Sequence, residues 1–128
     1  MDYYFSKTLT ISFDEAIIAL TEALKKEGFG IISDIDIREK FREKLGVDFR
    51  KYRILGACNP GYAYKALEAE EKIGTMLPCN IIVIDKGNGQ TEVAAVNPVA
   101  SMMAVQNPGL EPLAMEVTEK LQKVIAGL

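Results

Sequence analysis

Histidine is absent from this chain of 128 residues. Serine–histidine and cysteine–histidine catalytic pairs, histidine metal ligands and a histidine-bound haem are therefore excluded within one chain. No apolar run approaches the roughly 20 residues that a membrane-spanning helix needs. The amino terminus lacks the basic and apolar regions of a secretory signal, so we expect a cytoplasmic protein with no membrane partner.

An excess of positive charge is also missing. The chain has fifteen Lys and Arg residues and eighteen Asp and Glu residues, which gives a net charge of −3. This balance makes nucleic acid an unlikely partner, because phosphate-backbone binding needs a basic surface. Residues 38–53 hold seven basic and three acidic side chains. A solvated helix face explains this local pattern better than a nucleic-acid patch does.

Linkers, repeats and low-complexity tracts are absent too, and 48% of the residues are hydrophobic against 26% charged. Such a composition is typical of an ordinary globular protein. We therefore expect residues 1–128 to form a single domain, which is a suitable length for one hydrophobic core.

Strand and helix signals alternate along the chain. Apolar and β-branched runs predict strands at residues 3–11, 31–36, 52–58, 79–85 and 91–96. Helical spacing and capping residues predict helices at residues 13–27, 37–45, 60–74 and 111–128, with a short helical piece after Asn97-Pro98. Alternation alone would also suit a parallel α/β sheet. The hairpin around Gly87-Asn88-Gly89 and the short strands favour an antiparallel α+β fold instead.

The chain has two cysteines, and each is followed by an asparagine: Cys58-Asn59 and Cys79-Asn80. Both pairs stand at the end of an extended apolar run, so the fold could bring two thiols and two amides together at one edge of the sheet. Because the cytoplasm is reducing, we expect free thiols rather than a disulfide.

Two segments carry a family resemblance: residues 55–60 read LGACNP and residues 73–80 read IGTMLPCN. With Asn97-Pro98 and the methionines at 102 and 103, they make the chain resemble the domain-of-unknown-function family 302 over nearly its whole length. Thr75-Met76 departs slightly, since members tend to carry leucines there. The resemblance implies an α+β fold with a curved antiparallel sheet packed by helices, similar to the TATA-binding protein, and a homodimer. It implies no established activity.

Most of the candidate residues have two interpretations, one functional and one structural. Cys58 precedes a predicted helix start, where the helix dipole could favour a reactive thiolate. Alternatively, the Cys58 side chain is a small buried hydrophobic group at the end of the strand. Asn59 is explained as a helix cap. Asn80, an amide in an apolar strand, either braces the Cys58 loop or faces a ligand. Met102 and Met103 fill the core or form an apolar surface for a ligand or second subunit.

Three functional hypotheses follow from these residues. The first is a homodimeric domain that binds a small ligand or a partner around Cys58, Asn59, Cys79 and Asn80. The second is a thiol-dependent redox protein or enzyme in which Cys58 is the nucleophile and Cys79 supports it. The third is a structural interaction module. The cofactor is unknown, and no metal site is predicted, because two thiolates fall short of the usual four zinc ligands.

Overall fold

Residues 2–128 are described by a computed structural model of the chain. Five strands form one antiparallel sheet in the order β1-β5-β4-β3-β2. The strands are β1 (Tyr4–Leu9), β2 (Gly30–Asp36), β3 (Tyr52–Cys58), β4 (Cys79–Gly87) and β5 (Gln90–Val96). The helices are α1 (Phe13–Lys26), α2 (Ile37–Leu45), α3 (Pro60–Ala69), α4 (Pro98–Ser101) and α5 (Glu111–Ala126), with 3₁₀ turns η1 (Glu71–Met76) and η2 (Met103–Val105). The prediction of an antiparallel α+β fold is confirmed.

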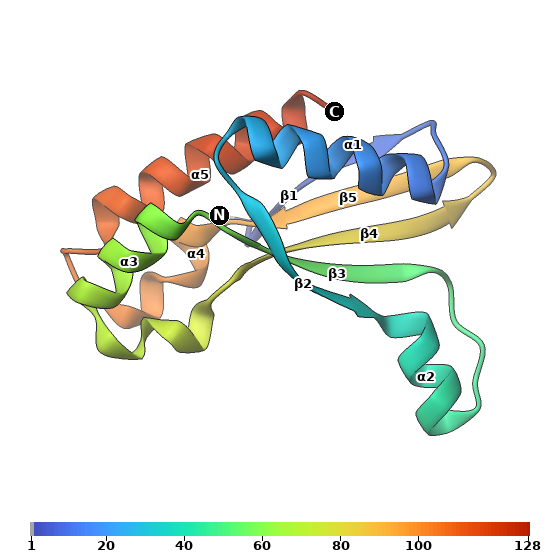
Figure 1. The fold of residues 1–128 in the computed structure, drawn as a ribbon, viewed down its shortest axis with the longest axis horizontal. Coiled ribbons are helices and arrows are strands. Elements are labelled where there is room, and N and C mark those ends of the chain that lie inside the picture. Colours follow the sequence, from blue (N-terminus) through green and yellow to red (C-terminus); the bar gives the residue numbers. More distant parts are fainter. Residues whose placement is uncertain (1) are drawn as a thin grey trace.

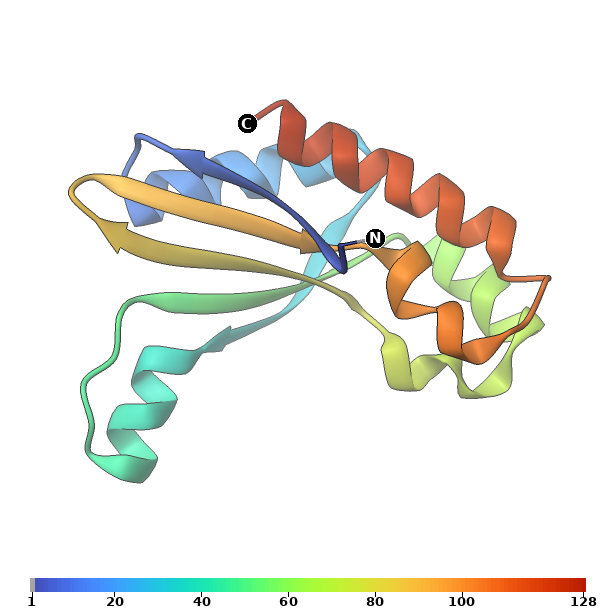
Figure 2. The same cartoon turned by 180° about the vertical axis from the view of Figure 1, so that it is seen from behind.

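Helices α1 and α5 lie side by side on one face of the sheet (Figures 1 and 2). The main hydrophobic core lies between these helices and the sheet. Its fully buried members include Leu20, Leu24, Leu55, Ile81, Val83, Val93 and Leu121. None of the helices in residues 2–128 forms such a layer on the opposite face of the sheet. We call this surface the open face (Figure 2).

Local capping signals place the helices as the sequence predicts. The Ser12 side chain accepts a hydrogen bond from the Glu15 backbone N–H, and the Glu15 carboxylate accepts one from the Ser12 backbone N–H, which makes a complete capping box at α1. Asp36 caps α2, and Gly46 ends it in the left-handed conformation with φ +64°. Asn59 caps α3, with Pro60 in its first turn.

One predicted helix is divided in the structure. The sequence predicts a helix to residue 74, whereas α3 ends at Ala69 and η1 follows from Glu71. Glu70 between them is extended, with φ −149° and ψ 106°. The Asn107 amide donates to the Ala69 carbonyl at 3.0 Å and to the Glu70 carboxylate at 3.1 Å. This contact with a distant segment satisfies groups at the end of α3, and no local pattern signals it.

Helix α2 and the loop after it form an arm beyond the sheet (Figure 1). None of the α2 side chains is buried. Within the arm, the Phe41 and Phe49 rings make an edge-to-face contact, with their centroids 5.1 Å apart. The basic residues of segment 38–53 thus belong largely to an exposed helix and loop, as the solvated-face interpretation predicts.

Candidate functional site

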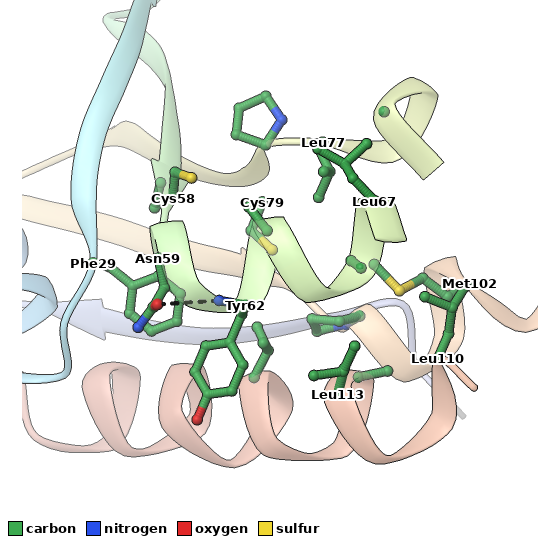
Figure 3. A pocket seen from close by; sticks show the side chains of 18 of the residues that line it. Phe29, Cys58, Asn59, Tyr62, Leu67, Leu77, Cys79, Met102, Leu110 and Leu113 are labelled. Atoms are coloured by element: carbon green, nitrogen blue, oxygen red, sulfur yellow. Dashed lines mark hydrogen bonds between the residues drawn. The ribbon is translucent and has the colours of Figure 1, made fainter. Parts of the chain in front are cut away.

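A cavity of about 370 Å³ lies beyond the sheet, where α3, the segment before β4, α4 and α5 meet (Figure 3). Nearly all of its lining is apolar. The lining residues are Phe29, Ile32, Ala57, Cys58, Asn59, Tyr62, Ala63, Ala66, Leu67, Gly74, Leu77, Pro78, Cys79, Pro98, Met102, Leu110, Leu113, Ala114 and Val117. A volume of this size suits a small organic molecule.

The pairing of β3 with β4 brings both cysteines to this cavity. Ala57 is the register partner of Cys79, and Cys58 is the next residue along β3. Both thiols are free and both side chains line the cavity (Figure 3). The expectation that the two strand ends meet at one edge of the sheet agrees with this geometry.

Asn59 is held in a fixed orientation at the cavity wall. Its Oδ1 accepts hydrogen bonds from the backbone N–H groups of Gly61 at 3.1 Å and Tyr62 at 3.4 Å. These two donors identify the oxygen end of the amide, since Nδ2 cannot accept from them. Nδ2 lies near Gly28, where a β-carbon would come within 2.9 Å of it. Asn59 therefore serves as the helix cap, and its amide nitrogen lies next to Gly28, which is not among the lining residues.

Asn80 does not line this cavity. It pairs with Gly56 on β3, and its exposed side chain borders a separate hollow on the open face with Tyr3, Tyr4 and Ile82. Alternation along β4 places Asn80 on the open face, whereas its neighbour Cys79 lines the cavity. Three of the four predicted ligand-binding residues, Cys58, Asn59 and Cys79, thus share a cavity, and the fourth lies elsewhere.

The two thiols differ in their surroundings. Burial raises the pKa of the Cys79 thiol to about 11, and the neighbouring Cys58 contributes to the same shift. Desolvation disfavours the thiolate, so Cys79 remains a neutral thiol at physiological pH. Beside the Tyr62 hydroxyl on α3, the Glu116 carboxylate raises the pKa of Tyr62 through a hydrogen bond, and this phenol also stays protonated.

Several lining residues could not be assigned from the sequence. Ala66, Ile73 and Leu110 form a second small core, with Leu77, Met102 and Leu113 packed against it. The cavity lies between this cluster and the main core, so its walls come from segments far apart in the chain.

Met102 lines the cavity, as one of its two interpretations allowed, whereas Met103 is 64% exposed. Leu113 and Val117 carried only a helical-periodicity signal.

Metal binding has no support from the geometry. Within residues 2–128, no group of three or more Cys, Asp or Glu side chains is arranged to hold a metal ion.

In the same part of the chain, no helix has the length and apolar character needed to cross a membrane.

A five-stranded antiparallel sheet, one helical layer and an apolar cavity at the sheet's end define an α+β protein with a pocket of small-molecule size. Residues 5–128 match the family model described as "Domain of unknown function DUF302", and the chain belongs to this family. It is 25% identical over 122 residues to a protein of Aquifex aeolicus described as "Uncharacterized protein", with 95% of this chain and 78% of that protein covered.

A solved structure shows the same fold. It is the crystal structure of an uncharacterized conserved DUF302 protein from Bacillus stearothermophilus, with a TM-score of 0.90, 29% identity and 98% of each chain covered. The family resemblance predicted from residues 55–60 and 73–80 is therefore confirmed. The closer likeness of the sheet to the TATA-binding protein stays a prediction.

Proposed function

We propose that this protein binds a small, mainly apolar organic molecule in the cavity lined by Cys58, Asn59 and Cys79. The observation that carries the proposal is an apolar-walled space of about 370 Å³ next to these few polar side chains. Ligand pockets commonly combine such walls with a small number of fixed polar groups. The apolar walls provide affinity through burial, and the polar groups orient the ligand.

The polar groups limit the ligand's own chemistry. The cavity offers the two cysteine thiols as weak hydrogen-bonding groups. Among residues 2–128, no acidic or basic side chain lines it. A charged ligand would lose its hydration without gaining an ion pair, which costs several kcal/mol. The expected ligand is therefore neutral, with an apolar chain or ring.

A homologous series of straight-chain alcohols tests this proposal by isothermal titration calorimetry. Each CH₂ group that enters the cavity should improve the binding free energy by about 0.8 kcal/mol. The gain should stop when the chain exceeds the length of the cavity. Affinity that is undetectable for every chain length, or that rises without limit as in nonspecific surface binding, would contradict the proposal.

A matched pair of variants on α3 locates the binding site. Ala63 lines the cavity, whereas Ala69 is exposed on the same helix and is not part of the lining. Ala63→Leu should fill part of the cavity and weaken the binding of the longest alcohols. Ala69→Leu should bind them as the unchanged protein does. Equal affinities in the two variants would place the binding site elsewhere.

We further propose that the protein acts as a homodimer, with the open face as the contact between two copies. Ile35, Ile54, Ile82 and Ala94 are register partners in one row across this face. Ile35 is 44% exposed, Ile54 and Ile82 are half-buried and Ala94 is buried, and no helix of residues 2–128 covers the row. Exposed apolar patches commonly mark interaction sites.

A second copy suits this row because the patch is uncharged. In a twofold interface the same surface meets itself, so a charged patch would suffer like-charge repulsion, whereas an aliphatic row does not. Sedimentation velocity of Ile82→Glu tests the contact. We expect this variant to be monomeric, while Ile18→Glu, which alters an exposed side chain of α1 on the helical side, should sediment as a dimer. A monomeric unchanged protein, or a dimeric Ile82→Glu variant, would contradict the proposal.

A further inference from the structure

Sulfur is concentrated in the wall of the cavity. Seven of the 128 residues carry sulfur, namely two cysteines and five methionines. Among the nineteen lining residues, three carry it: Cys58, Cys79 and Met102. Sulfur is more polarizable than aliphatic carbon, so these side chains give the wall a property that hydrophobicity alone does not describe.

The sulfur atoms lie on two sides of the space. Cys79 packs against the main core, as Tyr62 does, whereas Met102 packs against the second small core. Figure 3 shows Cys58 and Cys79 toward one end of the lining and Met102 toward the other. A ligand between the two cores therefore meets sulfur on both sides.

We propose that the ligand of this cavity is aromatic, and that the sulfur-bearing side chains select a planar ring over a saturated ring of the same carbon number. This inference rests on the proposed function and narrows its class of ligand. Sulfur makes favourable contacts with aromatic rings at about 5 Å, often at the ring edge. The rings of Phe29 and Tyr62 also line the cavity, and aromatic pairs attract each other beyond the burial of area.

The charges at the wall suit a ring. The faces of an aromatic ring carry partial negative charge. No carboxylate of residues 2–128 lines the cavity. Burial raises the pKa of the Cys79 thiol to about 11, so this sulfur is uncharged at physiological pH. No full negative charge in the wall therefore repels the faces of the ring.

The size of the space also fits. An apolar cavity of about 150 Å³ is sufficient to bind benzene. The cavity described here has a volume of about 370 Å³. It can therefore hold one aromatic ring together with a substituent.

Benzyl alcohol and cyclohexylmethanol test the inference by isothermal titration calorimetry, because they have the same number of carbon atoms and one hydroxyl group each. The saturated ring is the bulkier and more apolar of the two, so burial of apolar area alone favours cyclohexylmethanol. We expect the opposite order. Benzyl alcohol should bind about three- to tenfold more tightly, which is the effect of one or two sulfur–ring contacts.

The substitution Met102→Leu removes one sulfur atom with little change in volume. It should weaken the binding of benzyl alcohol about two- to fivefold and leave that of cyclohexylmethanol nearly unchanged. A merely structural disturbance would weaken both ligands alike. Met103→Leu is the matched control, because Met103 is 64% exposed and is not among the lining residues.

A measurement on the unchanged protein locates the ring without any substitution in the wall. In protein with ¹³C-labelled methionine methyl groups, benzyl alcohol should shift the Met102 methyl resonance through its ring current. Cyclohexylmethanol has no ring current and should shift it much less. The exposed Met103 methyl group should respond to neither ligand.

The outcomes separate this inference from the proposed function. If cyclohexylmethanol binds as tightly as benzyl alcohol or more tightly, the aromatic selectivity is wrong and the binding site stands. A preference for benzyl alcohol that persists in full in Met102→Leu, or a Met102 methyl group without a ring-current shift, also overturns the inference. If neither ring nor any straight-chain alcohol binds, both proposals fail together.

Discussion

Gly56 and Pro78 approach each other so closely that no side chain fits between them. A β-carbon on residue 56 would lie 2.5 Å from Cγ of Pro78 and 2.2 Å from Oγ of Ser33. The register pairs Gly56 with Asn80 and Ala57 with Cys79, so this close contact lies next to the strand ends that carry Cys58 and Cys79. The glycine therefore supports the geometry of the site without lining it.

Gly56→Ala should destabilise the protein by about 1–3 kcal/mol, because the added methyl group forces backbone or Pro78 to shift. Gly30→Ala is the matched control, since a β-carbon there meets no atom within 4 Å. Urea unfolding of both variants measures the difference. Equal free energies of unfolding for the two variants would show that Pro78 can shift to accommodate the methyl group without loss of stability.

Cys79 should make the stability of the protein depend on alkaline pH. Its pKa is raised from 9.0 to about 11 in the folded protein, so the unfolded chain loses this proton first as the pH rises. Stability is therefore complete below pH 9 and falls between pH 9 and about 11, by up to about 2–3 kcal/mol.

Unfolding free energies of the unchanged protein and Cys79→Ala, measured at several pH values across this window, isolate the effect from other titrating groups. The difference between the two proteins should shrink as the pH rises. A difference that stays constant with pH would show that the Cys79 pKa is not raised.

Asn59→Ala should cost about 1 kcal/mol of stability, because the first backbone N–H groups of α3 lose the acceptor that caps them. Asn59→Ser should recover most of this loss. Thermal unfolding of the two variants measures it, and a serine variant as unstable as the alanine variant would argue against the capping role.

The α2 arm should exchange its amide hydrogens much faster than α5. None of the α2 side chains is buried, whereas α5 buries Ala114, Val117, Leu121, Val124 and Ile125. Few buried contacts mean a low free energy of local opening. Phe49→Ala removes the ring that packs on Phe41, and it should speed exchange in α2 while leaving α5 unchanged. Equal protection of the two helices in the unchanged protein would contradict this account.

The sequence was sufficient for the features that depend on near neighbours. The caps at Ser12, Asp36 and Asn59 act within three residues, so their patterns predict the starts of α1, α2 and α3. The end of α3 bonds to Asn107, which is distant in sequence, and the helical pattern predicts this end too late.

The candidate site was predictable only in part, for the same reason. Cys58 and Cys79 could be placed together because Cys58 ends one apolar strand and Cys79 begins the next. Asn80 lies outside this cavity, at the hollow on the open face. The rest of the cavity wall joins residues such as Phe29, Leu77 and Leu113, which only the packing of the second small core brings together.

The most direct test of the central claim is an NMR titration of the native protein with hexanol, following backbone amide and methyl shifts. If hexanol binds in the cavity, we expect saturable shifts confined to the cavity wall, in α3, the residues around Cys79 and the first half of α5. Shifts centred on the open face around Ile82, or no saturable shifts at all, would contradict it.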